Sequence, residues 1–295
     1  MTETTHEAVV IGAGVAGMAT AAALAEAGAQ TALIDDGYMG GLVMNIGLIE
    51  GEAHAGQSGA DLVDLYLTQA LGAGVDYRVG AAEALAQADG LWRLPEHDIA
   101  AGHVILATGA RLKTLDVPGE AELVGRGVSQ CAFCDGGLYK GQDVVVVGGG
   151  DAAFQEALHL AELCNSVTML VRGEAPRARA AFQERAAAHA NLSIRTGVEV
   201  TEIVGADGVD AVRLADGTTL ATRAVFVFVG VAPASNLAPV KAPRDATGAL
   251  AVDPVTLATP VPGLYAVGAV RAGHGGGLDH ALADAALAAK AIAGL

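Results

Sequence analysis

The chain has 295 residues, a length that predicts two domains. Its 17 lysines and arginines stand against 33 acidic residues, and the net charge of −16 argues against nucleic acid and anionic membranes as partners. No apolar stretch approaches the roughly 20 residues that span a bilayer, and residues 1–7 lack the basic-then-apolar order of a signal peptide, so we expect a cytoplasmic protein.

The first predicted unit is a strand, a turn, a helix and a second strand. Residues 8–11 form an apolar run typical of a buried strand, and a glycine-rich segment over residues 12–17 follows it directly. A helical stretch is expected over residues 18–28. The second strand is expected over residues 31–34 and leads into Asp35.

The same unit recurs in the second half of the chain. Residues 143–147 predict a strand, residues 148–153 a second glycine-rich turn, the next residues up to Cys164 a helix, and residues 166–171 another strand. Other expected elements are short strands over residues 75–79, 103–107, 198–204, 211–214, 225–229 and 264–267, and a last helix from Leu278. The repeated unit predicts an α/β fold with two Rossmann-like dinucleotide-binding domains.

The second domain is expected to be inserted into the first. The expected hinges are residues 111–118 and 242–248. The first domain is therefore predicted to be discontinuous, over residues 1–113 and 246–295. The inserted domain would cover residues 114–245.

The first glycine-rich turn fits a dinucleotide-binding fingerprint. Gly12 permits a tight turn, Gly14 lets the backbone approach a pyrophosphate, and Gly17 allows the helix to pack closely on the strand. The free N–H groups at the start of the helix would then face the phosphates. Asp35 stands where an acid binds an adenosine ribose hydroxyl. The alternative is a glycine-rich turn that binds no ligand.

The second turn carries the opposite charge at the equivalent strand end. Gly148 and Gly150 begin a similar fingerprint, but Arg172 follows the second strand, and Arg177 comes soon after it. Arginine at this place suits a ribose 2′-phosphate. Two fingerprints with opposite charge indicate two different dinucleotides, one of them phosphorylated. The alternative is that the arginines are the ordinary solvated start of a helix.

Cys131 and Cys134 form a CxxC pair shortly before the second turn. This spacing places both sulfurs on one helical turn, where a helix N-terminus stabilises a thiolate and Asp135 can relay a proton. Zinc is an alternative, but it needs two further ligands, and the sequence has no second CxxC and no spaced histidine pair. A chance pair of buried cysteines is another. Cys164 is expected to lie in the core.

Taken together, these residues resemble the low-molecular-weight thioredoxin reductase family. The resemblance is carried by residues 125–136 around the CxxC, by Ala107–Ala110 before the domain crossover and by Val229–Pro233 where the family's chain returns to the first domain. It covers essentially the whole chain in order. It implies FAD on the first fingerprint, NADPH or NADH on the second, and a homodimer.

The resemblance also implies roles for single residues. Cys134 would face the flavin, Cys131 would exchange with substrate, and Asp135 would be the acid–base group. The implied FAD-binding residues are Gly12, Gly14, Ala16, Gly17, Asp35, Gly41, Leu42, Thr108, Gly109, Gly268, Ala269, His280 and Ala281. The implied nicotinamide-nucleotide residues are Gly148, Gly150, Asp151, Ala152, Arg172 and Arg177. For His280, a helix cap or a surface position is the alternative to contact with FAD.

Some positions depart from the family pattern. Ala269 replaces an aspartate that hydrogen-bonds the ribityl chain of FAD, and Leu42 replaces a glutamine after the glycine pair. Gly51 aligns loosely with a flavin-contacting asparagine. Gly173 replaces the second arginine of the family's NADPH site. These changes bear on the strength of FAD binding and on the choice of coenzyme.

The leading functional hypothesis is a thioredoxin reductase-like enzyme. Electrons would pass from NADPH through FAD to the Cys131–Cys134 disulfide and on to a thioredoxin-like protein or a small disulfide. One alternative is an FAD-dependent dithiol oxidase that closes a small-molecule disulfide with oxygen as acceptor. The other is a non-catalytic nucleotide-binding homologue.

Overall fold

The computed structural model describes residues 3–50 and 54–294. The chain divides into two compact units, of which the first comprises Met1–Arg111 and Ala232–Leu295 and the second Leu112–Val231. The second unit is thus inserted into the first. The chain returns to the first unit after Val231, earlier than the expected hinge at residues 242–248. The reason is that Ala238, Ala242 and Leu250 are buried in the core of the first unit.

The first unit is built on a seven-stranded sheet with the order β3-β2-β1-β6-β5-β4, in which β17 also pairs with β6. Pairs among β1, β2, β3, β6 and β17 are parallel, whereas β5 pairs antiparallel with β4 and with β6. The strands are β1 (Thr4–Ile11), β2 (Thr31–Asp35), β3 (Asp76–Val79), β4 (Ala86–Ala88), β5 (Leu91–Leu94), β6 (Ile99–Leu106) and β17 (Leu264–Ala266). The helices are α1 (Val15–Glu26), η1 (Gly41–Asn45), α2 (Gly59–Gly72), η2 (Pro95–His97), η4 (Gly268–Val270) and α6 (Leu278–Ala293).

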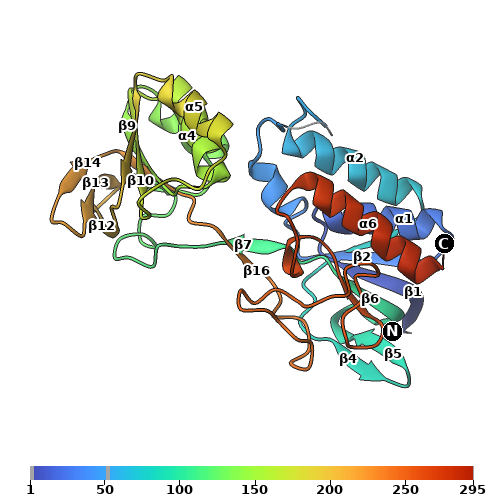
Figure 1. Ribbon diagram of the computed structural model, residues 1–295. Coiled ribbons are helices and arrows are strands. Elements are labelled where there is room, and N and C mark those ends of the chain that lie inside the picture. The colour runs from blue at the N-terminus through green and yellow to red at the C-terminus, as the bar shows by residue number, and fades with distance from the viewer. Residues whose placement is uncertain (1–2, 51–53, 295) are drawn as a thin grey trace. The chain divides into compact units, whose positions relative to one another are not determined.

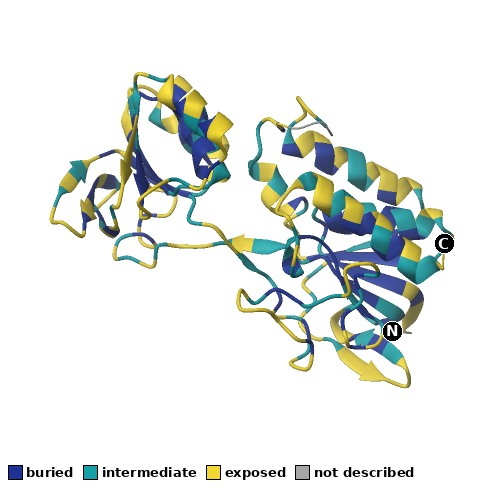
Figure 2. Cartoon of the chain, viewed as in Figure 1, coloured by how far each residue is buried: buried dark blue, intermediate teal, exposed yellow. Residues whose placement is uncertain are grey.

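Both faces of this sheet are covered, which explains the apolar run in β1. Ala8 and Val10 belong to the core beneath the helices, and Val9 and Ile11 belong to the core on the other face. Successive side chains of a strand point to opposite faces, so a strand buried on both faces is apolar throughout. Helices α1, α2 and α6 lie together on one face of the sheet (Figure 1). The central strands are accordingly the most buried part of the unit (Figure 2).

The second unit has a parallel five-stranded sheet with the order β11-β10-β9-β15-β8 and an antiparallel sheet with the order β12-β13-β14. Its strands are β8 (Val128–Ser129), β9 (Asp143–Val147), β10 (Ser166–Val171), β11 (Leu192–Thr196), β12 (Val200–Gly205), β13 (Val209–Leu214), β14 (Thr219–Ala221) and β15 (Ala224–Val227). Its helices are α3 (Ala132–Asp135), η3 (Gly136–Tyr139), α4 (Asp151–Leu163) and α5 (Ala180–Ala187). Val144 and Val146 of β9 pack with the helices, whereas Val145 and Val147 pack with the smaller sheet.

The two segments that connect the units pair with each other. They are β7 (Ala110–Leu112) and β16 (Val231–Pro233), which form a two-stranded sheet. Both segments overlap the motifs from which a domain crossover was expected, Ala107–Ala110 and Val229–Pro233.

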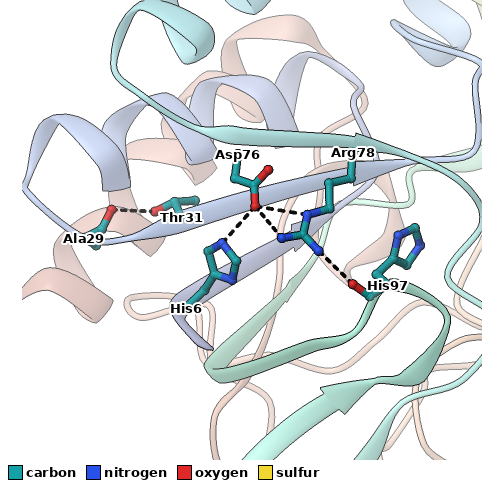
Figure 3. Close-up of polar contacts among 6 residues, drawn as sticks. All are labelled: His6, Ala29, Thr31, Asp76, Arg78 and His97. Atoms are coloured by element: carbon teal, nitrogen blue, oxygen red, sulfur yellow. Dashed lines mark hydrogen bonds and ion pairs between the residues drawn. The ribbon is translucent and has the colours of Figure 1, made fainter. Parts of the chain in front are cut away.

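A polar cluster fixes the sheet of the first unit at the starts of its strands. Asp76 at the start of β3 accepts hydrogen bonds from Arg78 at 2.7 and 3.0 Å and contacts His6 Nε2 of β1 at 3.1 Å (Figure 3). Arg78 also donates to the His97 carbonyl oxygen at 2.7 Å. The Arg78 guanidinium holds the pKa of Asp76 below its usual value. The first glycine turn follows the end of β1, so it lies at the opposite end of the strands from this cluster.

Candidate active site

The first glycine turn joins β1 to α1 with little room for side chains. Gly12 has a φ of 108°, and a Cβ there would lie 2.5 Å from the Ala107 carbonyl oxygen. A Cβ on Gly17 would lie 1.9 Å from the Gly12 carbonyl oxygen. At Gly14, by contrast, the nearest atom to a Cβ would be 3.9 Å away. The outer glycines therefore serve packing, and Gly14 presents open backbone at the start of α1.

A cavity of about 650 Å³ opens at this turn, and its lining belongs entirely to the first unit. The expected FAD-binding residues that line it are Gly12, Gly14, Asp35, Gly41, Leu42, Thr108, Gly109 and Ala269. Side chains that sequence analysis did not propose also line it, among them Asp36, Tyr38, Glu83, Arg111 and Asn236. Among the described residues, the expected positions outside the lining are Ala16, Gly17, Gly268, His280 and Ala281. Gly51 lies outside the described residues.

Asp35 is a buried carboxylate that ties two loops to the end of β2. Its Oδ1 accepts the Ala13 N–H at 3.1 Å, and its Oδ2 accepts the Gly37 N–H at 3.0 Å. The residue is only 6% exposed. A carboxylate can accept about four hydrogen bonds, so two backbone donors leave capacity for a ligand hydroxyl.

The turn that carries Ala269 is held by a buried ion pair. Asp284 of α6 accepts the Gly268 N–H at 2.8 Å and hydrogen bonds from Arg271 at 2.5 and 2.7 Å. Burial raises the pKa of Asp284, but the hydrogen-bond donors around it outweigh burial and bring the pKa to about 2. His274 Nδ1 also lies 3.6 Å from the carboxylate, so the low pKa of Asp284 is set by His274, Arg271 and the Gly268 N–H together. The sequence signal for this contact was an aspartate in the middle of the alanine-rich helix α6, beyond Asp279 of its first turn.

The second glycine turn leaves its arginines accessible. A Cβ on Gly148 would lie 2.3 Å from the Phe228 carbonyl oxygen, whereas Gly150 has open space around it. Arg172 and Arg177 are exposed, and neither forms an ion pair within the described part of the chain. Ala152, at the start of α4, is exposed as well. The turn and both guanidinium groups thus remain available to a ligand.

Asp151 has a partner that the sequence did not indicate. Its carboxylate accepts the Arg179 N–H at 2.8 Å and the Arg179 Nε at 2.6 Å. The contact spans the loop after β10 and fixes that loop to the first turn of α4. Arg179 is therefore committed to a structural contact, unlike Arg172 and Arg177.

A disulfide joins Cys131 to Cys134, with their Cα atoms 5.3 Å apart. Cys131 is 8% exposed, whereas Cys134 is exposed. The Cys134 N–H donates to the Cys131 sulfur at 3.0 Å. Asp135 is oriented by the Ser129 hydroxyl, which donates to its Oδ2 at 2.6 Å. The helix behind the pair, α3, is one turn long, so the helix-dipole effect expected from the sequence is reduced to that of a single turn.

Glu156 is a further residue of this site that sequence analysis missed. It lies on α4, and its Oε2 accepts the Ala132 N–H, between the two cysteines, at 2.8 Å. Burial raises the pKa of Glu156, and hydrogen bonds from the N–H groups of Ala132 and Phe133 partly offset that effect. A carboxylate therefore contacts both peptide N–H groups of the residues that separate the cysteines.

Comparison with known proteins gives one consistent result. The Pyridine nucleotide-disulphide oxidoreductase family matches residues 6–290. The chain belongs to this family. Thioredoxin reductase of Treponema pallidum is 34% identical over 300 residues, which cover 99% of this chain and 97% of the relative. The Lactococcus lactis thioredoxin reductase structure has a TM-score of 0.92 at 30% identity, with 98% of this chain and 100% of that chain covered. The thioredoxin reductase structure from T. acidophilum has a TM-score of 0.91 at 29% identity, with 98% of both chains covered.

Membership of the pyridine nucleotide-disulphide oxidoreductase family establishes an enzyme of this class with thioredoxin reductase-like architecture. It implies the use of a flavin and a pyridine nucleotide. The expected fold of two dinucleotide-binding domains, one inserted into the other, is confirmed.

The remaining sequence expectations concern Cys164, His280, membrane-spanning helices and metal-binding clusters. Cys164 is a buried free thiol, as expected, and burial raises its pKa. The His280 ring lies edge-on to His274, with ring centroids 6.0 Å apart. Within residues 3–50 and 54–294, no helix is long and apolar enough to cross a bilayer. The same residues contain no group of three or more potential ligands close enough to hold a metal ion.

Proposed function

We propose that this flavoenzyme uses NADPH and FAD to reduce the Cys131–Cys134 disulfide and then passes both electrons to a thioredoxin-like protein or a small disulfide. The observation that carries the proposal is a redox-active CxxC spacing, seen as a disulfide, in the unit that bears the arginine-ended glycine turn. One NADPH and one proton would yield NADP⁺ and two thiols. Relatives named thioredoxin reductase support the identity of the partner.

The cavity of the first unit fits FAD. Bound FAD would accept a hydride from a nicotinamide and deliver two electrons to a disulfide. Gly14 offers open backbone to a pyrophosphate at the start of α1, and Asp35 retains acceptor capacity for a ribose hydroxyl. Thr108 orients the cavity wall by donating to the Ala234 carbonyl oxygen at 2.7 Å. Ala269 offers no side-chain acceptor to the ligand.

The second unit is proposed to bind NADPH in preference to NADH. Arg172 and Arg177 are exposed and free of ion pairs among the described residues. A ribose 2′-phosphate carries close to two negative charges, and a guanidinium can bind it with two hydrogen bonds. Gly173 supplies no second charge beside Arg172, so the preference for NADPH is expected to be modest and NADH should also be used.

The thiol chemistry is proposed to use Asp135 as the acid–base group. Its carboxylate, held by Ser129, follows Cys134 directly in the chain. The family resemblance assigns exchange with substrate to Cys131, but the structure buries Cys131 and exposes Cys134. Exposure favours Cys134 as the sulfur that a bulky disulfide reaches first. Trapping the mixed disulfide with each single-cysteine variant decides between them.

The direct test is a visible spectrum recorded under argon. Purified protein incubated with FAD should be yellow after dialysis, NADPH should bleach the flavin band, and oxidised thioredoxin should restore it. Protein that stays colourless in FAD would overturn the proposal. No bleaching by NADPH or NADH, together with bleaching by a small dithiol and recovery on adding oxygen, would favour a dithiol oxidase.

Two further features are proposed from the family resemblance. A homodimer is expected, and sedimentation velocity of the flavin-loaded protein measures it. A cytoplasmic location fits a chain whose two paired cysteines form a redox couple and whose third is a free buried thiol.

A further inference from the structure

Glu156 contacts the backbone of the turn that joins the two cysteines. The CxxC turn contains three successive N–H groups, those of Ala132, Phe133 and Cys134. The first two donate to the Glu156 carboxylate, with Ala132 N at 2.8 Å from Oε2. Only the third, from Cys134, donates to the Cys131 sulfur. The carboxylate therefore takes the peptide donors that could otherwise stabilise negative charge on a sulfur.

The charge balance around the turn adds to this effect. Asp135 of α3 lies next to Cys134, and Glu156 of α4 packs against the two intervening residues. Other titratable groups near the turn are His159 of α4, whose ring centroid lies 5.9 Å from that of Phe133, and the Tyr139 phenol of η3. The pKa of Tyr139 is raised by burial and by the charge of Asp135, against a lowering effect of Arg223. Within the described residues, no lysine or arginine forms an ion pair with Glu156. Two carboxylates would thus lie close to the reduced sulfurs, and among the described residues neither is in an ion pair with a lysine or an arginine.

We propose that Glu156 is a positioning residue of the redox pair, which fixes the CxxC turn through the N–H groups of Ala132 and Phe133 and disfavours thiolate on the reduced cysteines. The proposal rests on the function proposed above. Loss of a proton from either thiol creates a negative charge, and a nearby like charge opposes that step. A dithiol whose thiolate is destabilised is a stronger reductant, because stabilising the reduced form is what makes a disulfide oxidising. This suits a chain that donates electrons to other disulfides.

The test is the pH profile of alkylation of the reduced holoenzyme. Protein reduced with excess dithiol and passed through an anaerobic desalting column is treated with iodoacetamide from pH 5 to 10. Mass spectrometry of the peptide over residues 127–140 then gives the rate at each cysteine. Glu156→Gln removes the charge and keeps the shape of the side chain. The midpoint for thiolate formation should fall by about one pH unit, a roughly tenfold gain in thiolate below both midpoints.

The matched control lies on the same helix. Glu162→Gln removes an exposed carboxylate of α4 and should leave the midpoint at the wild-type value. A midpoint for Glu156→Gln that equals that of wild type, or lies above it, would overturn the proposal. If Glu156→Gln fails to fold, Glu156→Asp keeps the charge but withdraws it by one methylene. That variant should lower the midpoint by a smaller amount, and an unchanged midpoint would again overturn the proposal.

A second readout is the reduction potential of the pair, measured against a dithiol buffer at a pH above both midpoints. A tenfold stabilisation of the reduced form in Glu156→Gln corresponds to an increase of about 30 mV. A role limited to folding would move neither the pH profile nor the potential. Because alkylation and dithiol exchange need no nicotinamide and no protein substrate, their outcome is independent of whether NADPH and thioredoxin are the physiological partners.

Discussion

The two glycine turns share a strand–turn–helix–strand framework but differ at the end of the second strand. In the first unit, Asp35 is 6% exposed and accepts two backbone hydrogen bonds. In the second unit, Arg172 is exposed and forms no ion pair among the described residues. Asp35 contributes to the fold as well as to the cavity lining, whereas Arg172 makes no ion pair with the rest of the described chain. Substitution at the same position of the repeated motif is therefore expected to destabilise the fold in the first unit but not in the second.

The largest expected effect is loss of disulfide reduction when either cysteine of the Cys131–Cys134 pair is replaced. Cys131→Ser and Cys134→Ser should each abolish reduction of thioredoxin or of a small disulfide, because neither variant can form the Cys131–Cys134 disulfide. Flavin reduction by NADPH in the first step should survive in both. Stopped-flow absorbance measures that step, and a coupled disulfide assay measures the second. Full disulfide reductase activity in both variants would show that the CxxC is not the redox centre.

The next largest effect is on the free energy of unfolding, which Asp35→Ala should lower more than Arg172→Ala. Asp35→Ala leaves the Ala13 and Gly37 N–H groups without their acceptor, and two lost hydrogen bonds to a buried carboxylate should cost about 3 kcal/mol of unfolding free energy. Arg172→Ala should change it by less than about 0.5 kcal/mol, as expected for an exposed side chain. Urea unfolding of the FAD-free protein measures both. Equal losses in the two variants would contradict the distinction between the turns.

Asp284 gives the first unit a pH-dependent contribution to its stability. Because its pKa in the folded protein is about 2, below the unfolded value, the unfolded chain takes up the proton first as the pH falls. The ion pair with Arg271 therefore stabilises the fold fully above about pH 4, and about 2–3 kcal/mol of that is lost as the pH falls towards 2. Asp284→Asn should be less stable than wild type at pH 7 by about 3 kcal/mol.

The measurement for Asp284 is urea unfolding of wild type and Asp284→Asn at pH 7, 5, 4 and 3. The difference between them should be constant from pH 7 to 5 and should narrow below pH 4. A difference that stays constant down to pH 3 would show that the carboxyl is not held ionised by Arg271 and its neighbours His274 and Gly268.

The smallest expected effect concerns coenzyme choice. One charge-assisted contact is worth about 1.5–3 kcal/mol, so Arg172→Ala should raise the KM for NADPH by roughly tenfold or more. The KM for NADH should stay nearly constant, and the preference for NADPH should largely disappear. Arg179→Ala is the comparison, because that side chain is held by Asp151 and should affect both coenzymes alike. Equal use of NADPH and NADH by the wild type would show that Arg172 does not contact the 2′-phosphate.

Much of the fold follows from local sequence signals. The strands around both glycine turns are buried on two faces, so they are apolar without interruption and easily found. Helix α2 has a narrower apolar face, with Leu62, Val63 and Ala70 buried, and was not predicted. Its signal was the capping box formed by Ser58 and Asp61, whose reciprocal hydrogen bonds the structure shows.

Sequence analysis could predict only those parts of the site that lie within local backbone motifs. The glycine turns and the CxxC are local in sequence, and the resemblance motif Val229–Pro233 contains Val231, after which the chain returns to the first unit. Glu156 and Asp284 act through contacts with Ala132 and Gly268, which are distant in sequence. Such contacts depend on how the helices pack, and no local pattern specifies them.

The central claim is that a flavin and the Cys131–Cys134 disulfide form one chain of electron transfer. Anaerobic titration of FAD-loaded protein with NADPH tests it most directly, because the flavin and the disulfide each take up two electrons. Wild type should consume two equivalents of NADPH per FAD before reduction is complete, and Cys131→Ser should consume one. Complete reduction of the wild type by a single equivalent would contradict the account.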